Sequence, residues 1–477
     1  MSLVSFIRMS FSTIPCLQII FVLVTLYRVN TTIREELFSM IEAGILGIFS
    51  CFLILSLACG ISLIWALLAG FILFFFYGLY RHHPFHEMLH LSFEGIHTTK
   101  NVLITLALVG ILTASWRICG TIPYIVYYAA QWCHPTVILT ASFLLCGLIS
   151  MLMGTSFGTA ATMGVICMTM TNSMHIPAVY AGGAILAGVY IGDRCSPMST
   201  SALLVATITQ TDIFKNVILM MKTAAVPLLA SILVYTVLGM SLPTIETTTH
   251  TAAIFQQYFS LHWITALPAV LVVILSCCRI HVKYIMLSSI LTAAIIAYVW
   301  QHMSVSAIGY AFFFGFHPDN PQLAQLLEGG GILSMARVLA IIFISSSYAG
   351  IFSGTGFLRN IQSHIQRLSE KISPFGAILL TSILTGMISC NQTLAIMLTH
   401  QLCRPIEPDS QRMAIHLENT AVVTTPLIPW AIACSVVLAV INAPVSSIGI
   451  ACYLYAIPLW DFLQNYRHRT TGCDKTI

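Results

Sequence analysis

Charged side chains are scarce in this sequence. Only 8% of its 477 residues are Asp, Glu, Lys or Arg, whereas 58% are hydrophobic. An ordinary soluble domain contains about 25% charged residues, so a large water-soluble fold is excluded. The formal net charge of +4 is small and spread along the chain, which excludes the basic surface that nucleic-acid binding requires. We therefore expect the lipid bilayer, and not nucleic acid, to surround this chain.

The sequence also lacks any regular cysteine spacing. Its fifteen cysteines form neither a disulfide framework nor a metal-binding motif. Most of them, such as Cys51, Cys146 and Cys434, lie inside apolar runs. We expect them to act as small buried apolar residues, and we expect no cofactor and no structural metal.

Long apolar runs joined by short polar connections occupy most of the chain. The earliest, at 14–27, lacks a convincing cleavage site and is interpreted as a retained first span. One spanning helix needs about 20 residues, so the length accommodates about ten to thirteen transmembrane helices. The predicted fold class is an all-α, polytopic integral membrane protein.

Glycine and proline interrupt the apolar sequence twice, at 154–201 and again at 385–430. Corresponding interruptions in two halves predict inverted repeats with broken or re-entrant helices, and a binding site at the level where the repeats meet. The expected divisions are an N-terminal half (1–240), a linker (241–262), a C-terminal half (263–460) and a hydrophilic tail (461–477).

Basic residues gather in three of the connections, and the rule that basic loops face the cytoplasm predicts a cytoplasmic C-terminus. The chain is thus expected to be a multi-pass protein of the cell (inner) membrane. The residues concerned are Arg279 and Lys283, then Arg359, Arg367 and Lys371, and finally Arg467, Arg469 and Lys475.

Asp193 is the most informative acid in the first half. It follows the apolar run 184–192 and precedes Pro197, which breaks or kinks a helix. An acid at membrane depth is costly and indicates an ion or proton site, and broken helices occur there only where they line a cavity or meet protein. The alternative is that Asp193 lies in an aqueous loop beside a solvated Arg194.

Glu418 is its counterpart in the second half, just before a hydroxyl-rich segment containing Pro426 and Pro429. A hard monovalent cation is bound by oxygen atoms, so carboxylates, hydroxyls and freed carbonyls form a suitable site. A carboxylate without its water can instead take up a proton, and competition between the two ions gives antiport. Alternatively, Glu418 is satisfied at a helix N-terminus.

The other acids fall in stretches that are interpreted as polar connections. Such a position outside the membrane implies no role in transport, because loop acids are solvated and common. They include Glu35, Glu36, Glu42, Glu370, Glu407, Asp409 and Asp461.

Four segments resemble the diagnostic motifs of the NhaC-type sodium/proton antiporter family and occur in the same order. They are TSFGTAATMGV (155–165), AGGAILAGVYIGDRCSPMS (181–199), TDIF (211–214) and LENTAVVTTPLIPW (417–430). The segment WRICGTIPYIVYY (116–128) also fits the family pattern. The resemblance runs from about residue 40 to 460. It implies a secondary transporter with two inverted halves, which exchanges sodium for protons or couples such gradients to a small organic acid or amino acid.

The resemblance also carries over site residues. Asp193, Ser196, Ser199 and Glu418 match the family pattern directly. Three expected acids are missing, because Thr200, Asn391 and Asn419 stand in their places. Loss of carboxylates weakens cation binding, so exchange of an organic solute remains an alternative to sodium/proton antiport.

The predicted site therefore combines the two acids with neutral oxygen-bearing neighbours, and sodium, a proton or a small organic solute is its expected ligand. A chain of this kind could also form a homodimer. The predicted site residues are Asp193, Ser196, Ser199, Thr200, Asn391, Glu418 and Asn419, with Thr155, Ser156 and Thr159 on a facing helix.

A competing hypothesis comes from His86-Glu87-Met88-Leu89-His90, which fits the zinc-protease pattern H-E-x-x-H. Histidines one helical turn apart bind zinc, and the glutamate activates water. However, this region is rich in histidine throughout, and no later motif supplies a third ligand. We therefore favour a transporter over an intramembrane metalloprotease, and over an enzyme in general.

Overall fold

The computed structural model describes residues 41–471, apart from 243–253, 356–368 and ten single positions. Those positions are 43, 46, 54, 57, 58, 60, 133, 279, 370 and 371. The predicted first span and half of the predicted linker lie outside the described residues. Within the described residues the fold is helical, with one isolated bridge between Phe316 and Gly329 and no strand. The predicted all-α class is confirmed.

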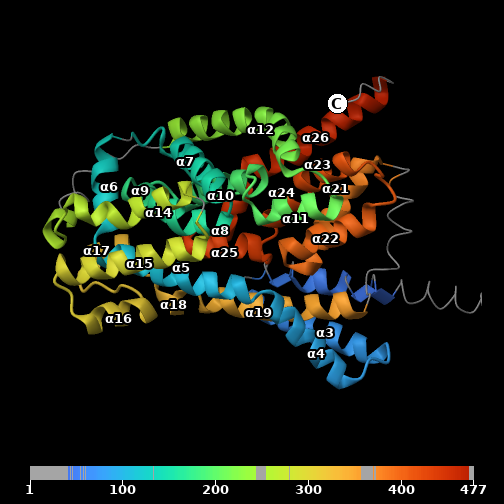
Figure 1. Ribbon diagram of the computed structural model, residues 1–477, viewed down its shortest axis with the longest axis horizontal. Coiled ribbons are helices and arrows are strands. Elements are labelled where there is room, and N and C mark those ends of the chain that lie inside the picture. Colours follow the sequence, from blue (N-terminus) through green and yellow to red (C-terminus); the bar gives the residue numbers. More distant parts are fainter. Residues whose placement is uncertain are drawn as a thin grey trace, which may run out of the picture.

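The first described helices alternate with short connections (Figure 1). Helix α5 ends at Ile118, and Gly120 follows with φ +83°, which separates α5 from the next helix. The helices are α3 (Leu63–Tyr80), α4 (Phe85–Thr98), α5 (Lys100–Ile118), α6 (Thr121–Trp132) and α7 (Ile138–Met153).

The central stretch contains the interruptions that its small residues predicted. A π-helical turn, Ala160–Gly164, separates two short helices, and an extended segment follows Cys195. The helices are α8 (Ser156–Thr159), α9 (Val165–Ser173), α10 (Ala178–Cys195), α11 (Thr200–Thr209) and α12 (Ile213–Ser241). In Figure 1, α10 lies in the middle of the molecule and α12 runs along its upper edge.

The second half repeats this alternation of long and broken helices. Its helices up to the second interruption are α14 (Leu267–Cys277), α15 (Val282–Val299), α16 (Val305–Phe314), α17 (Pro321–Leu327), α18 (Gly331–Ser334), α19 (Ala336–Thr355) and α21 (Pro374–Ser389). The remaining helices are α22 (Gln392–Cys403), α23 (Ser410–Asn419), α24 (Ala421–Thr424), α25 (Ile432–Val440) and α26 (Cys452–Thr471). Short 3-10 turns occur at Trp263–Ala266, Thr425–Leu427 and Val445–Ile450.

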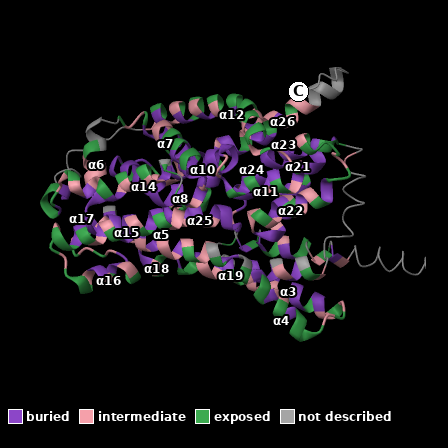
Figure 2. Ribbon diagram, in the orientation of Figure 1, coloured by how far each residue is buried: buried purple, intermediate pink, exposed green. Residues whose placement is uncertain are grey.

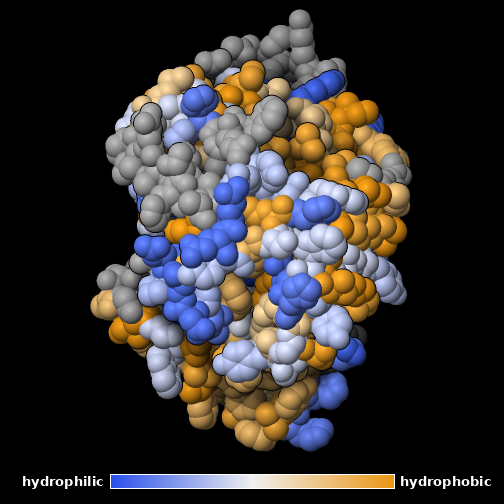
Figure 3. All heavy atoms as spheres, turned by 90° about the vertical axis from the view of Figure 1, so that its left-hand side faces the viewer, coloured by the Kyte–Doolittle hydropathy of each residue, from blue (hydrophilic) through white to orange (hydrophobic). Residues whose placement is uncertain are grey.

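The lengths and compositions of several helices suit a membrane. Two described helices, Ile213–Ser241 and Val282–Val299, are long and apolar enough to cross one alone. Two bent pairs pass the same test together: Phe85–His97 with Val102–Ile118, bent by 45°, and Ser410–Leu427 with Ile432–Val440, bent by 54°. Apolar side chains also cover much of the end view in Figure 3, with hydrophilic ones gathered toward its middle. The predicted polytopic class is confirmed, whereas the count of ten to thirteen spans stays a prediction.

Helix α10 forms the centre of the core. Every residue from Ala181 to Cys195 is buried, as Figure 2 shows for the middle of the molecule. It packs most extensively against α7, because glycines let the two backbones approach closely. A Cβ added at Gly188 would lie 2.6 Å from the Phe143 carbonyl oxygen, and one at Gly192 would lie 2.0 Å from the Ser150 carbonyl carbon.

Replacing Gly192 by Ala is therefore expected to separate α7 from α10. Overpacking of a core typically costs about 1–3 kcal/mol, and contact with backbone atoms leaves little room to relax. The measurement is the melting temperature of purified protein in detergent. Gly309→Ala, in helix α16, is the matched control, since no atom lies within 4 Å of its added Cβ. Equal melting temperatures for the two variants would show that the α7–α10 contact tolerates widening.

Two acids that were assigned to polar connections are instead buried. Glu42 is fully buried and accepts a hydrogen bond from the Tyr77 hydroxyl at 2.8 Å. Asp461 lies within α26 and is 6% exposed. The sequence interpretation was wrong for both because a helix covered by its neighbours can carry an acid that has a hydrogen-bond partner.

Candidate functional site

The end of α10 positions Asp193. The helix stops at Cys195, and Ser199 caps the start of α11 by accepting hydrogen bonds from the amides of Ser201 (3.1 Å) and Ala202 (3.3 Å). The Ser199 hydroxyl donates to the Asp193 carbonyl oxygen. The break that Pro197 predicted is confirmed, and it folds the chain back over the acid.

The Asp193 carboxylate is buried and held by three neutral donors. It is 3% exposed, and it accepts hydrogen bonds from the hydroxyls of Ser199 (3.4 Å) and Ser201 (3.1 Å) and from the Gln392 amide (2.9 Å). The alternative that placed Asp193 in an aqueous loop is wrong. In the described part of the chain, no Lys, Arg or His lies within ion-pair distance of this carboxylate.

The interruption in the second half brings Gln392 to this acid. Helix α21 ends at Ser389, and Cys390 adopts the left-handed conformation with φ +54°. Asn391 then caps α22 by accepting from the Thr393 amide at 2.9 Å. The Gln392 side chain donates to both Asp193 and the Val422 carbonyl oxygen (3.2 Å), so it joins the broken helices of the two halves.

Glu418 lies near the C-terminal end of α23 and is fully buried. Neither of its carboxylate oxygens has a hydrogen-bond partner among the described residues. The alternative of a carboxylate satisfied at a helix N-terminus is therefore wrong. The charged groups that act on it electrostatically are Arg194 and Asp193.

Arg194 follows Asp193 on α10, and its side chain is fully buried, so the expectation of a solvated neighbour is wrong. Its guanidinium donates to the Met220 carbonyl oxygen (3.1 Å), to the Thr223 hydroxyl (2.7 Å) and to the Asn419 amide oxygen. Its Nε has no partner within the described structure. Arg194 thus follows one buried carboxylate in the chain and acts electrostatically on another, and within the described residues it forms an ion pair with neither.

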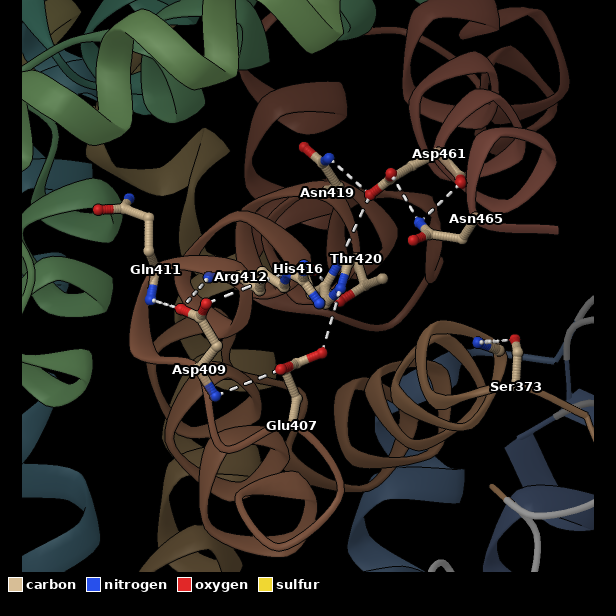
Figure 4. Close-up of polar contacts among 11 residues, drawn as sticks. Ser373, Glu407, Asp409, Gln411, Arg412, His416, Asn419, Thr420, Asp461 and Asn465 are labelled. Atoms are coloured by element: carbon tan, nitrogen blue, oxygen red, sulfur yellow. Dashed lines mark hydrogen bonds and ion pairs between the residues drawn. The ribbon is translucent and has the colours of Figure 1, made fainter. Parts of the chain in front are cut away.

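Asn419 connects this centre to a second polar cluster, which Figure 4 shows. Its amide nitrogen donates to Asp461 on α26 at 2.8 Å. Asp461 also faces His416 (3.6 Å), whose other ring nitrogen lies 3.9 Å from Glu407. The three ionisable side chains of this cluster are largely covered, at 9–12% exposure.

Several predicted residues do not reach the carboxylates. Ser196 is buried but donates to the Met151 carbonyl oxygen at 2.8 Å, and Thr200 is exposed. Thr159 donates to the Thr155 carbonyl oxygen at 2.8 Å, within its own helical turn. Asn391 caps the start of α22, and Ser156 is the buried first residue of α8. Of the predicted set, Ser199, Glu418 and Asn419 lie in the network around Asp193 and Arg194.

Sequence reasoning missed Arg194, Ser201, Gln392 and Asp461. A signal existed for Arg194, because it is adjacent to Asp193 at the end of an apolar run, and neighbouring opposite charges at membrane depth are expected to be functional. A signal also existed for Gln392, which is next to a predicted site residue. Nothing in the local sequence distinguishes Ser201 or Asp461.

The residues of this site lie in a part of the chain that matches a known protein family. Residues 188–460, more than half of the chain, match the Na+/H+ antiporter family over a region that contains Asp193, Arg194, Gln392 and Glu418. The chain belongs to this family. The family resemblance inferred from the motifs is confirmed, and sodium/proton antiport is favoured over the other functions considered.

Several known transporters are similar to this chain over most of its length. It is 26% identical over 354 residues to the malate-2H(+)/Na(+)-lactate antiporter of Bacillus subtilis, covering 71% of this chain and 74% of that protein. It is 26% identical over 390 residues to the Na(+)/H(+) antiporter NhaC of the same organism, covering 78% and 85%. The arginine/ornithine antiporter ArcD of Halobacterium salinarum is 25% identical over 357 residues, covering 71% and 73%. These relatives are transporters.

The metalloprotease hypothesis gains no support from the geometry. His86, Glu87 and His90 lie on α4 and are exposed, and Glu87 pairs with His83 at 3.4 Å. Among the described residues, no group of three His, Cys, Asp or Glu side chains is arranged to hold a metal ion. A catalytic zinc site requires three protein ligands.

Proposed function

We propose that this protein is a secondary active transporter that exchanges sodium ions for protons, with Asp193 and Glu418 as the carboxylates for which the two ions compete. The observation that carries the proposal is the set of buried charges. Around Asp193, two buried carboxylates, Asp193 and Glu418, accompany one buried guanidinium, Arg194, whereas Asp461 faces His416 in the second polar cluster and Glu42 accepts from Tyr77. This leaves one negative charge unbalanced.

An unbalanced charge in the interior costs several kcal/mol, because desolvation of an ion is only repaid by an opposite charge or by hydrogen bonds. One sodium ion or one proton supplies that opposite charge. The site is therefore more stable with one cation bound than empty. If a sodium ion and a proton bound together, the site would carry a net positive charge. Mutually exclusive occupancy is the requirement for antiport.

The surroundings of the two carboxylates differ, and we infer that they contribute differently to proton and sodium binding. Asp193 already accepts three hydrogen bonds from neutral groups that stabilise its charged form. Glu418 accepts none among the described side chains. We propose that Glu418 takes up the proton more readily, whereas Asp193, Ser199 and Ser201 supply oxygen ligands for sodium.

We also propose how the repeats, the membrane orientation and the assembly of the protein are organised. The two interruptions, α10–α11 and α21–α22, meet through Gln392 as expected of two inverted repeats divided near 241–262. We place the protein in the cell membrane with its C-terminus in the cytoplasm, where the positive-inside rule locates the basic connections. A homodimer is the assembly we propose.

The test is transport by purified protein in liposomes that contain a pH-sensitive dye. Addition of sodium outside acidic vesicles is expected to raise the internal pH, and potassium is not. Separate arms contain lactate, malate or arginine in place of sodium, and then together with it. A pH change that requires one of these organic solutes, with no response to sodium alone, would contradict sodium/proton antiport.

A further inference from the structure

Asp461 lies outside the carboxylate pair described above, and it forms no hydrogen bond with Asp193 or Glu418 in the described structure. It belongs to α26, in the last part of the chain, whereas Asp193 is on α10. The residue is nevertheless only 6% exposed, and both of its carboxylate oxygens have hydrogen-bond partners. The Asn419 amide donates to Oδ2 at 2.8 Å, and the Asn465 amide donates to Oδ1 at 3.0 Å.

The contact with Asn419 decides which way that amide points. A side-chain amide has a donating end and an accepting end, and a carboxylate accepts only. Because Asp461 accepts from the Asn419 nitrogen, the Asn419 oxygen faces the other way, toward Arg194, and accepts a hydrogen bond from its guanidinium. Asp461 thereby fixes an acceptor for Arg194 without touching it.

The position of Arg194 matters because Glu418 is near it. Glu418 interacts electrostatically with Arg194, yet no ion pair joins them among the described residues. Glu418 has two unpartnered oxygens, and Arg194 has an unpartnered Nε. The two groups have the capacity to pair, and the hydrogen bonds of Arg194 to Asn419, Thr223 and Met220 hold the guanidinium in its present place.

We propose that Asp461 is a positioning residue that sets the sodium affinity of the transport site by orienting Asn419, so that Arg194 is held away from Glu418. Without this orientation, the Asn419 amide can turn its nitrogen toward Arg194. The guanidinium then loses an acceptor, meets a donor, and pairs with Glu418. Arg194 then compensates Glu418, one of the two carboxylates for which sodium and the proton compete, and so becomes an internal competitor of the transported cation. This inference rests on the antiport proposed above.

The test is Asp461→Asn, measured as sodium/proton exchange in liposomes. The variant keeps the shape of the side chain but allows its own nitrogen to donate to Asn419, which reverses the amide. The apparent KM for sodium is expected to rise by about tenfold, the order expected for loss of a hydrogen bond to a charged group. The maximal rate is expected to stay within about twofold of that of the wild type, because the carboxylates of the site are unchanged.

A reciprocal exchange separates positioning from general damage. In the double variant Asn419→Asp with Asp461→Asn, the new carboxylate accepts from Arg194 and the new amide donates to it, with the total charge unchanged. The KM for sodium is expected to return toward the wild-type value. Asn465→Ala is the matched control, since it removes the other side-chain donor to Asp461 and leaves Asn419 in place. Its KM is expected to equal that of the wild type.

The outcomes are distinguishable from failure of the proposed function. A wild-type protein that neither exchanges sodium for protons nor gains thermal stability from sodium overturns antiport itself. A wild type that does both, with an unchanged KM in Asp461→Asn or with no recovery in the double variant, overturns the role of Asp461 alone. Should Asp461→Asn fail to fold, Asn419→Ala removes the same link, and an unchanged KM there overturns the proposal.

Discussion

Replacing Asp193 by Asn is expected to reduce sodium/proton exchange to less than about one hundredth of the wild-type rate, because the buried charges then balance without a transported ion. The remaining pair, Glu418 and Arg194, is neutral overall. No unbalanced negative charge is left to attract sodium into the protein. The neutral amide also supplies a poorer ligand for a hard cation than a carboxylate does.

The measurement is sodium-driven alkalinisation of liposomes that contain equal amounts of each variant. Asp212→Asn is the matched control, because Asp212 is an exposed acid that caps α12, and asparagine caps equally well. Its exchange rate is expected to equal that of the wild type. Unchanged exchange in the Asp193 variant would remove this carboxylate from the mechanism.

Replacing Arg194 by Met is expected to destabilise the folded protein by about 3–5 kcal/mol, the cost of leaving the buried Glu418 carboxylate without a nearby opposite charge. Arg194 is the opposite charge that acts on Glu418, and it donates to Asn419, Thr223 and the Met220 carbonyl oxygen. Methionine fills similar space but supplies neither the charge nor the donors. The measurement is thermal unfolding in detergent without sodium.

A second substitution identifies the cause of that loss. Glu418→Gln in the Arg194→Met background removes the uncompensated carboxylate and is expected to recover part of the stability. Arg412→Met is the control, because Arg412 is 57% exposed and pairs with Asp409 at 4.0 Å. An exposed pair contributes less than about 1 kcal/mol. If Arg194→Met melted like the control, the guanidinium would not balance a buried charge.

The fold class and the two acids could be predicted because each depends on local sequence. Apolar runs fix where helices form, and Gly120 and Pro197 fix two of the places where they end. Asp193 and Glu418 were found because an acid beside an apolar run is rare. Thr200 was expected in the site for its oxygen, but it faces outward, since a shift of one residue along a helix start changes the direction of the side chain.

The sequence by itself determined that this is a polytopic helical membrane protein of a sodium/proton antiporter type, with an acid at each of two helix breaks. Only the tertiary structure decided which groups surround those acids. Gln392 reaches Asp193 from 199 residues away, and Asn419 reaches Asp461 from 42 residues away. Such contacts arise when helices that are distant in the sequence pack together. The hydrogen-bond partners of these acids are therefore properties of the packed interior and not of any local segment.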